Sequence, residues 1–306
     1  TGQGEEHTAY LRPETAQAIF LDYKNVLNST RIKVPFGIAQ MGKAFRNEIT
    51  TGNFIFRTIE FEQMEIEYFV REENWQEIFD SWLGEMLDWC YAIGLKKERL
   101  KQREHAQEDL SHYSKKTTDI TYIFTFGEGE LYGLAYRGDF DLISHQTHSK
   151  ESLIYHDSKT GEKFLPHVIE PTFGLDRTVL ACLCSSYHEE ELATGDKRTV
   201  LHFPPSIAPV KVAVFPLMRK EIQQQQARAV FQQLQPLFAT EYDESGAIGK
   251  RYRRQDELGT PFCVTIDFDT ATDQSVTLRY RDSMKQERLP IAKLLATLTQ
   301  LLNYND

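Results

Sequence analysis

The chain has 306 residues, of which 41% are hydrophobic and 26% charged, and its formal net charge is −10. This length and composition are typical of two ordinary globular domains and exclude a disordered chain. The acidic balance excludes a generic basic coat for nucleic acid, although it allows a local basic patch.

The four cysteines, Cys90, Cys182, Cys184 and Cys263, form no CxxC pair. Their spacing fits neither a zinc site nor a small disulfide scaffold, so we interpret them as reduced thiols of a cytoplasmic protein. No run approaches the roughly 18 apolar residues of a membrane span, and no signal peptide is visible, so we expect no membrane partner. The first residues, "TGQGEEHTAYLRPETAQ", are typical of the interior of a domain, so we expect further residues upstream.

Residues 1 to about 202 predict a mixture of strands and helices without regular alternation. Aromatic and β-branched residues predict two long strands, 31–49 and 53–70, joined by the turn "TTGN". A helix is predicted over 74–94, because aromatic residues recur there at intervals of three or four residues and Gly94 stands where a helix would end. A hairpin is predicted over 120–142, and a strand over 167–171 leads into a helix over 174–187.

The segment "HFPPSIAP", 202–209, is the clearest domain boundary, because its three prolines interrupt regular structure. Beyond it, strands are predicted at 210–217, 262–269 and 275–282, with helices at 219–238 and 291–302. Such alternation is typical of a small α/β domain. We therefore divide the chain into domains 1–204 and 205–306.

The tetrapeptide "FRNE" ends the first long strand and places Arg46 and Glu48 on the same face of it. An arginine can bind a phosphate through two parallel hydrogen bonds, and a glutamate can accept from an amino group. An ion pair across the strands is the plainer alternative.

The segment "EPTFGLDR", 170–177, predicts a change from strand to helix with Arg177 in the first helical turn. The helix dipole favours an acid at that place, so a bound anion would explain the arginine. An ion pair between Arg177 and a neighbouring acid such as Asp176 is the alternative.

Five carboxylates accompany these arginines: Glu14, Glu62, Glu65, Glu130 and Glu170. They suit a cation, either a substrate ammonium or Mg²⁺, unless they are simply the solvated surface of an acidic protein. The pattern Gly127, Gly129 and Gly133 departs from GxGxxG, so a hairpin turn is the better interpretation.

Two further patterns are weaker. Lys250, Arg251, Arg253 and Arg254 surround Tyr252, which is compatible with RNA binding, although a solvated run of charge is more common. The pair His145 and His148 has no further nearby ligands, so no zinc is expected.

In this order, "FRNE", "FRTIEFEQME" and "EPTFGLDR" resemble motifs 2 and 3 of class II aminoacyl-tRNA synthetases. The longer segments "YLRPETAQAIF", "VPFGIAQMGKAFRNEI", "HVIEPTFGLDRTVLA" and "YRRQDELGTPFCVTIDFD" resemble the glycyl-tRNA synthetase family of the single-chain homodimeric type, over nearly the whole chain. The resemblance implies an α+β fold, with an antiparallel catalytic sheet flanked by helices and then a small α/β anticodon-binding domain. Motif 1, which builds much of the family's dimer interface, is absent from the chain.

The resemblance further implies a ligase that activates glycine with ATP and transfers it to tRNA(Gly), with Mg²⁺ bound to the substrate and a homodimeric full-length protein. One alternative is a non-catalytic, nucleic-acid-binding relative of the polymerase accessory type. Another is a class II synthetase for a different small amino acid. The presence of Arg46, Glu48, Glu170 and Arg177 favours an enzyme over the non-catalytic relative, and Glu14 with the segment "FEQME" disfavours a different amino acid.

The resemblance also assigns roles in an ATP site. Arg46, Glu48 and Arg177 are the predicted catalytic residues, with Arg46 on the α-phosphate and Arg177 on the γ-phosphate. Phe61 is predicted to stack on adenine and Glu130 to hold Mg²⁺. The full predicted ATP site comprises Arg46, Asn47, Glu48, Phe56, Arg57, Thr58, Ile59, Glu60, Phe61, Glu130, Leu131, Gly174, Leu175, Asp176 and Arg177.

A glycine site follows from the same resemblance. Glu14 and Glu170 are predicted to bind the ammonium group, Arg137 the carboxylate, and Thr172 to line the pocket. The full predicted glycine site comprises Glu14, Phe61, Glu62, Gln63, Met64, Glu65, Arg137, Glu170, Pro171, Thr172, Phe173 and Gly174.

The chain departs from the family pattern at a few positions. Thr51 replaces a proline, which should loosen a loop expected near the tRNA acceptor end, because threonine does not fix φ. Ile59 replaces an arginine, and Thr172 replaces a serine but keeps the hydroxyl.

Overall fold

The computed structural model describes residues 10–192 and 195–302. The chain divides into two compact units, one of residues 1–89 and 96–181 and the other of residues 90–95 and 182–306. This division groups residues 182–204 with the second unit, whereas the sequence-based boundary between residues 204 and 205 groups them with the first.

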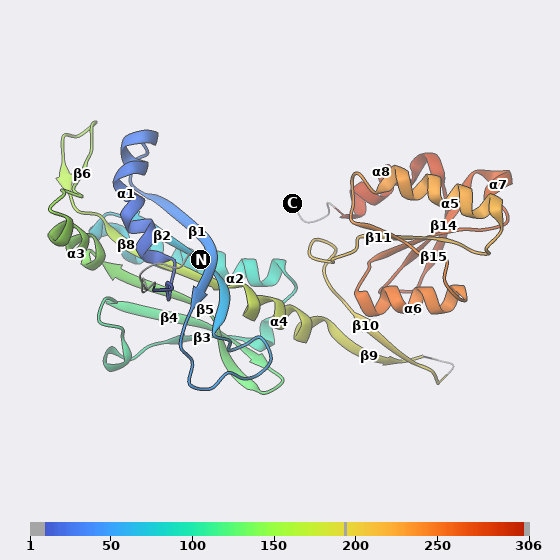
Figure 1. The fold of residues 1–306 in the computed structure, drawn as a ribbon, viewed down its shortest axis with the longest axis horizontal. Helices are drawn as coiled ribbons and strands as arrows, with labels where there is room; N and C mark the ends of the chain where they lie inside the picture. Colours follow the sequence, from blue (N-terminus) through green and yellow to red (C-terminus); the bar gives the residue numbers. More distant parts are fainter. Residues whose placement is uncertain (1–9, 193–194, 303–306) are drawn as a thin grey trace, which may run out of the picture. The chain divides into compact units, whose positions relative to one another are not determined.

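The first unit is built on a six-stranded sheet in the order β1-β2-β8-β5-β4-β3, in which every neighbouring pair is antiparallel (Figure 1). Its strands are β1 (Phe36–Phe45), β2 (Glu60–Val70), β3 (Leu100–Glu104), β4 (Lys116–Phe124), β5 (Gly127–Gly138) and β8 (His167–Gly174). The predicted antiparallel sheet, and with it the α+β class, is confirmed.

Helices lie on both faces of this sheet. On one face, α1 (Ala16–Thr30) and α3 (Phe140–Ser149) bury Phe20, Tyr23 and Leu142 against Phe69 of β2. On the other face, α2 (Trp75–Ala92) sets Trp82 edge-to-face against Tyr68. Because successive side chains of a strand point to opposite faces of the sheet, Tyr68 packs on one face and Phe69 on the other.

The two long strands expected at 31–49 and 53–70 are shorter than predicted. Strand β1 ends at Phe45 and β2 begins at Glu60, so Arg46 and Glu48 do not share a strand face, and that prediction is wrong. Residues 46–59 instead form a loop with one bridge, Gly52 to Arg57. Asn53 and Phe54 both adopt left-handed backbone, with φ of 55° and 56°, which turns the chain out of the ladder.

All four predicted helices are confirmed, with small changes at their ends. They are α2, α4 (Leu175–Ser186), α5 (Glu221–Leu234) and α8 (Ile291–Leu302). The sequence analysis missed α1, α3 and α6 (Ile248–Leu258). The sequence did contain a signal for α1, because its buried residues Ala16, Ile19, Phe20 and Tyr23 are spaced three and four residues apart.

The second unit contains a five-stranded sheet in the order β12-β11-β13-β14-β15. Helices α5 and α8 cover one face of this sheet and α6 covers the other (Figure 1). The strands are β11 (Val212–Pro216), β12 (Thr240–Tyr242), β13 (Phe262–Ile266), β14 (Ser275–Tyr280) and β15 (Gln286–Pro290), with a short helix α7 (Thr270–Asp273) before β14. The predicted α/β character of this region is confirmed, and the pairs of β11 with β12 and β13 are parallel.

Several small elements complete the described chain. Two-stranded hairpins are formed by β6 (Tyr155–His156) with β7 (Lys163–Phe164), and by β9 (Tyr187–Glu191) with β10 (Lys197–Leu201). Short 3-10 helices are η1 (Glu72–Asn74), η2 (Lys97–Arg99) and η3 (Gln107–Asp109). In the described ranges no helix has the length and apolarity that crossing a membrane would take.

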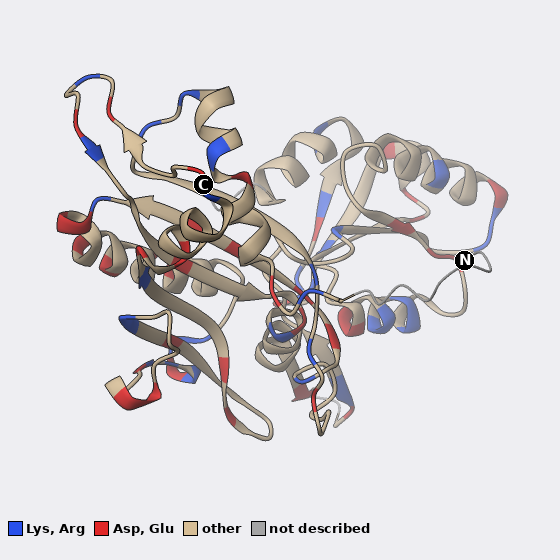
Figure 2. Ribbon diagram, turned by 60° about the vertical axis from the view of Figure 1, so that its left-hand side comes forward, with Lys and Arg blue, Asp and Glu red and all other residues tan. Residues whose placement is uncertain are grey.

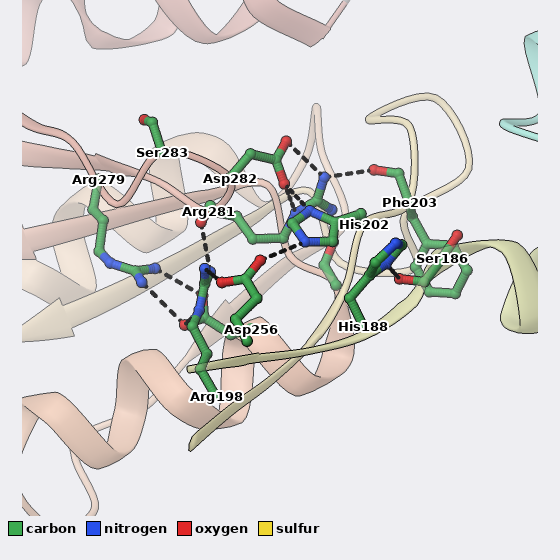
Figure 3. A network of polar contacts seen from close by, with 12 residues as sticks. Ser186, His188, Arg198, His202, Phe203, Asp256, Arg279, Arg281, Asp282 and Ser283 are labelled. Atoms are coloured by element: carbon green, nitrogen blue, oxygen red, sulfur yellow. Dashed lines mark hydrogen bonds and ion pairs between the residues drawn. The ribbon is translucent and has the colours of Figure 1, made fainter. Parts of the chain in front are cut away.

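A buried polar network ties the β9–β10 hairpin to the second sheet (Figure 3). Arg198 of β10 donates from Nε to Asp256 Oδ2 of α6 at 2.9 Å, and Arg279 of β14 donates to both oxygens of Asp256 at 2.8 and 3.0 Å. The side chains of Arg198 and Asp256 are fully buried. At the exposed end, His202 bridges Glu190 and Asp282 at 2.9 and 2.6 Å.

Two arginines of the basic run in α6 make contacts within the second unit instead of lying free on its surface. Arg251 is buried and donates to the carbonyl oxygens of Pro216 and Gly246, while Arg254 pairs with Asp243. Lysines and arginines elsewhere are interspersed with acids along the described elements (Figure 2). Arg251 is therefore a structural residue and is not part of an exposed basic patch, which weakens the interpretation of this run as an RNA-binding site.

We predict that Arg198→Met destabilises the second unit by about 3 kcal/mol, because Asp256 keeps its burial but loses one of its partners. Chemical denaturation of the chain would measure the free energy of unfolding. The control is Lys197→Met, on the same strand but exposed, which should change that free energy by less than about 0.5 kcal/mol. Equal effects of the two substitutions would contradict the role assigned to Arg198.

Candidate active site

Two adjoining hollows open on the first sheet. The one we call the arginine pocket is bordered by the loop 46–59, the start of β2, the first half of β5, the end of β8 and the start of α4. Its lining residues are Arg46, Glu48, Ile55, Phe56, Arg57, Thr58, Phe61, Glu62, Gln63, Glu130, Leu131, Tyr132, Gly133, Thr172, Gly174, Asp176 and Arg177.

Arg46 lies where β1 gives way to the loop. Its backbone N–H donates to Ile59 O at 2.9 Å, which fixes the start of the loop. Its Nε donates to Pro13 O at 3.2 Å, and its guanidinium carbon lies 5.2 Å from the ring centroid of Phe61. A cation beside an aromatic ring at the floor of a pocket can bind an anionic group attached to a planar base.

Arg177 in the first turn of α4 is held by the loop and by β5. Its Nε donates to Phe56 O at 3.2 Å and its guanidinium lies 4.5 Å from the centroid of the Phe56 ring. An ion pair of 3.1 Å joins it to Glu130, which is half-exposed. Phe56 itself packs edge-to-face on Phe124 and Phe126, so this arginine lies on a rigid aromatic support.

The second hollow, the acidic pocket, continues from the first across the sheet. It shares Arg46, Glu130, Gly133 and Thr172 with the arginine pocket. Its remaining lining residues are Glu14, Glu65, Arg103, His105, Asp109, Ser111, Tyr113, Thr117, Asp119, Leu134, Ala135 and Glu170. A molecule with a cationic end and an anionic end could therefore lie across the shared residues.

Glu65 fixes the start of α1 beneath the acidic pocket. Its carboxylate accepts from the backbone N–H of Thr15 at 2.7 Å and from the Thr15 hydroxyl, and it is 4% exposed. An acid at a helix N-terminus satisfies donors that have no partner within the helix. This contact places Glu14, the residue before Thr15, at the rim of the pocket.

Arg137 of β5 lies behind the acidic pocket. It is buried, donates from Nε and NH2 to the two oxygens of Asp141 at 2.7 and 2.8 Å, and donates from NH1 to Glu170. Its guanidinium also lies 3.9 Å from the centroid of the Tyr113 ring. Arg137 is thus bound to carboxylates of the chain itself, so its predicted contact with a substrate carboxylate would require one of these ion pairs to open.

Glu170 of β8 is buried at the end of this chain of contacts. Burial raises its pKa to about 7, and the neighbouring acids Glu65 and Glu14 act in the same direction, while Arg137 opposes the shift. Glu67 of β2 is fully buried, and its pKa is raised well above 4.5, first by burial and then by Glu170.

The structure brings most of the predicted residues together. The arginine pocket contains every predicted ATP residue except Asn47, Ile59, Glu60 and Leu175, and it also contains Phe61, Glu62, Gln63, Thr172 and Gly174 of the predicted glycine site. Glu14, Glu65, Glu170 and Thr172 line the acidic pocket. Met64, Phe173 and Leu175 face an apolar groove toward α2 instead.

The sequence analysis missed several residues that shape the site. Thr15, Asp141 and Glu67 hold or flank the predicted carboxylates, and Tyr113 lies over Arg137. The alternation of Gln63, Glu65 and Glu67 along β2 was a signal, because all three are buried on the same strand face.

No group of three or more His, Cys, Asp or Glu side chains in the described residues is arranged to hold a metal ion. Glu130, the predicted Mg²⁺ ligand, lines both pockets and is accessible. None of the four cysteines is in a disulfide.

Two sequence families match the chain. Residues 2–187 match the tRNA synthetase class II core domain (G, H, P, S and T), and residues 211–301 match an anticodon binding domain. The first match covers more than half of the chain and contains both pockets.

Curated proteins named glycine–tRNA ligase are similar to the chain. The protein of Ruminiclostridium cellulolyticum is 56% identical over 287 residues, which are 94% of this chain and 62% of that protein. Those of Lachnoclostridium phytofermentans and Staphylococcus aureus strain Newman are each 53% identical, over 95% of this chain and 63% of their own length. The chain thus spans less than two thirds of the relatives it matches.

We predict that Gly129→Ala destabilises the chain by about 1–3 kcal/mol, since the added Cβ would lie 2.7 Å from the Phe56 ring that supports Arg177. Thermal unfolding would measure the change. The matched control is Gly84→Ala in α2, where nothing lies within 4 Å of the new methyl group. That control should stabilise the helix by up to about 1 kcal/mol, so the two identical substitutions are expected to act in opposite directions.

Proposed function

Because this chain belongs to the class II tRNA synthetase family, we propose that it forms the catalytic core and anticodon-binding part of a glycine–tRNA ligase. The observation that carries the proposal is the junction of the arginine pocket with the acidic pocket at Arg46, Glu130, Gly133 and Thr172. ATP would occupy the first pocket and glycine the second. The names of the similar curated proteins support the choice of amino acid.

The acidic pocket selects the amino acid by charge and by space. The ammonium group of glycine would be bound by Glu14 and Glu170, with Glu65 beneath them. Carboxylates that converge on one ammonium group leave little room beside the α-carbon, so a side chain would clash or displace them. This arrangement favours glycine over larger amino acids.

In the first step, a carboxylate oxygen of glycine attacks the α-phosphorus of ATP and the bond to pyrophosphate breaks. Arg46, which lines both pockets, would bind the α-phosphate and stabilise the charge that develops there. Arg177 would bind the γ-phosphate, and Phe61 would stack on adenine. No proton acceptor is needed in this step, so catalysis is mainly positioning and charge stabilisation.

Mg²⁺ enters such a site with ATP and would neutralise phosphate charge. Glu130 fits this role, because its carboxylate is half-exposed at the junction of the pockets, and its 3.1 Å ion pair with Arg177 would open when phosphate takes up that arginine. In the second step, a ribose hydroxyl of tRNA(Gly) would attack the carbonyl carbon of the glycyl-adenylate, so that an ester bond forms, the anhydride bond breaks and AMP leaves. The second unit, with its anticodon-binding match, would bind the other end of that tRNA. We further propose that the full-length protein is a cytoplasmic homodimer.

The proposal predicts glycine-dependent exchange of pyrophosphate into ATP by the full-length protein. Arg46→Ala should lower the exchange rate by at least about 100-fold, because charge stabilisation at the α-phosphate is lost. Its control is Arg31→Ala, an exposed arginine after α1, which should leave exchange unchanged. An absence of exchange by the wild-type protein at saturating ATP would reject the ligase and favour a non-catalytic relative.

A second prediction concerns the ammonium site. Glu14→Gln removes one charge at the rim of the acidic pocket and should raise the KM for glycine by about 10–100-fold, with a smaller effect on kcat and on the KM for ATP. Steady-state exchange kinetics would measure these constants. Glu151→Gln, an exposed acid after α3, serves as the control and should behave as wild type. A rise confined to the KM for ATP would show that Glu14 contributes to binding ATP and not glycine, and would contradict the assignment.

A further inference from the structure

Glu67 is a buried acid to which the reaction described above assigns no role. Its side chain is fully buried, and neither of its oxygens accepts a hydrogen bond from any group in the described ranges. The pairing of Glu65 with Thr172 and of Tyr68 with Ile169 places Glu67 opposite Glu170 on adjacent antiparallel strands. Two carboxylates in such a position repel each other when both are ionised.

The neighbouring groups leave Glu67 without a donor. Arg137 is engaged by Asp141 and Glu170, and Glu65 is engaged by Thr15 at the start of α1. Glu14 is the remaining acid that acts on Glu170. A buried carboxylate with no donor is costly, whereas the neutral acid carries one O–H that a neighbouring carboxylate can accept.

We propose that Glu67 is a positioning residue of the amino acid site, which stays protonated and donates a hydrogen bond through its O–H to Glu170. Glu170 would then accept hydrogen bonds from both Arg137 and Glu67. These two contacts would fix the orientation of its carboxylate toward the acidic pocket. This inference rests on the proposed function, in which Glu170 binds the substrate ammonium. The raised pKa values of both acids agree with one proton held between them.

Two substitutions separate the donor from the packing. Glu67→Gln keeps a donor of similar size, whereas Glu67→Leu keeps only an apolar side chain. In pyrophosphate exchange by the full-length protein, the Gln variant should keep the glycine KM within about 3-fold of wild type. The Leu variant should raise it by about 10–100-fold, with the KM for ATP unchanged.

The pH profile gives a second readout that a purely structural role would not move. The proposed hydrogen bond from Glu67 would lower the pKa of Glu170, so its loss should raise that pKa further. The acid limb of kcat/KM for glycine should therefore move to higher pH in the Leu variant and stay in place in the Gln variant. Unfolding experiments should find the Leu variant as stable as wild type, because the substitution removes a buried acid.

A wild-type glycine KM and pH profile in the Leu variant would overturn the proposal, and so would equal losses in both variants. If the wild-type protein shows no glycine-dependent exchange, the proposed function fails independently. The proton on Glu67 is then tested by infrared spectroscopy near neutral pH. The wild type should show the carbonyl band of a neutral carboxylic acid that the Gln variant lacks, and identical spectra would overturn the proposal.

Discussion

The first unit depends on the ion pairs that the buried guanidinium of Arg137 forms with two carboxylates. The central strands place Glu67 and Glu170 side by side in the interior, where an ionised carboxylate is very costly without a partner. Arg137 reaches from β5 to Glu170 and to Asp141 of α3, so one cation connects the sheet to a helix that covers it. The position of the predicted ammonium ligand therefore depends on the same contact that anchors α3.

Glu65 joins fold and site in a similar way. Its carboxylate holds the N-terminus of α1 through Thr15, and the same contact places Glu14 at the rim of the acidic pocket. A change that loosens α1 would be expected to move Glu14, a predicted substrate ligand. This coupling explains why β2 carries three polar side chains on its buried face, where a strand that only packs a core would carry apolar ones.

The second unit contains a comparable arrangement of buried ion pairs. Asp256 of α6 is bound by Arg198 and Arg279, and these contacts tie a hairpin and a helix to the sheet (Figure 3). In the first unit the carboxylates instead border a hollow that a substrate can enter. The chemistry of buried ion pairs is shared, and access to a cavity distinguishes the acids of the proposed substrate site from Asp256.

Four helices and the charged motifs could be predicted from the residues, because periodicity and motif order are local properties, whereas the antiparallel sheet followed from the family resemblance. The sequence could not determine where β1 ends, because the left-handed turn at Asn53 and Phe54 and the packing of Phe56 decide that. The family resemblance predicted Arg137 and Glu65 as substrate ligands but not their partners Asp141 and Thr15, because a motif does not show which nearby side chain a buried charge will pair with. Only the tertiary structure decided which charges compensate one another, because that depends on which strands lie side by side and how deeply each carboxylate is buried.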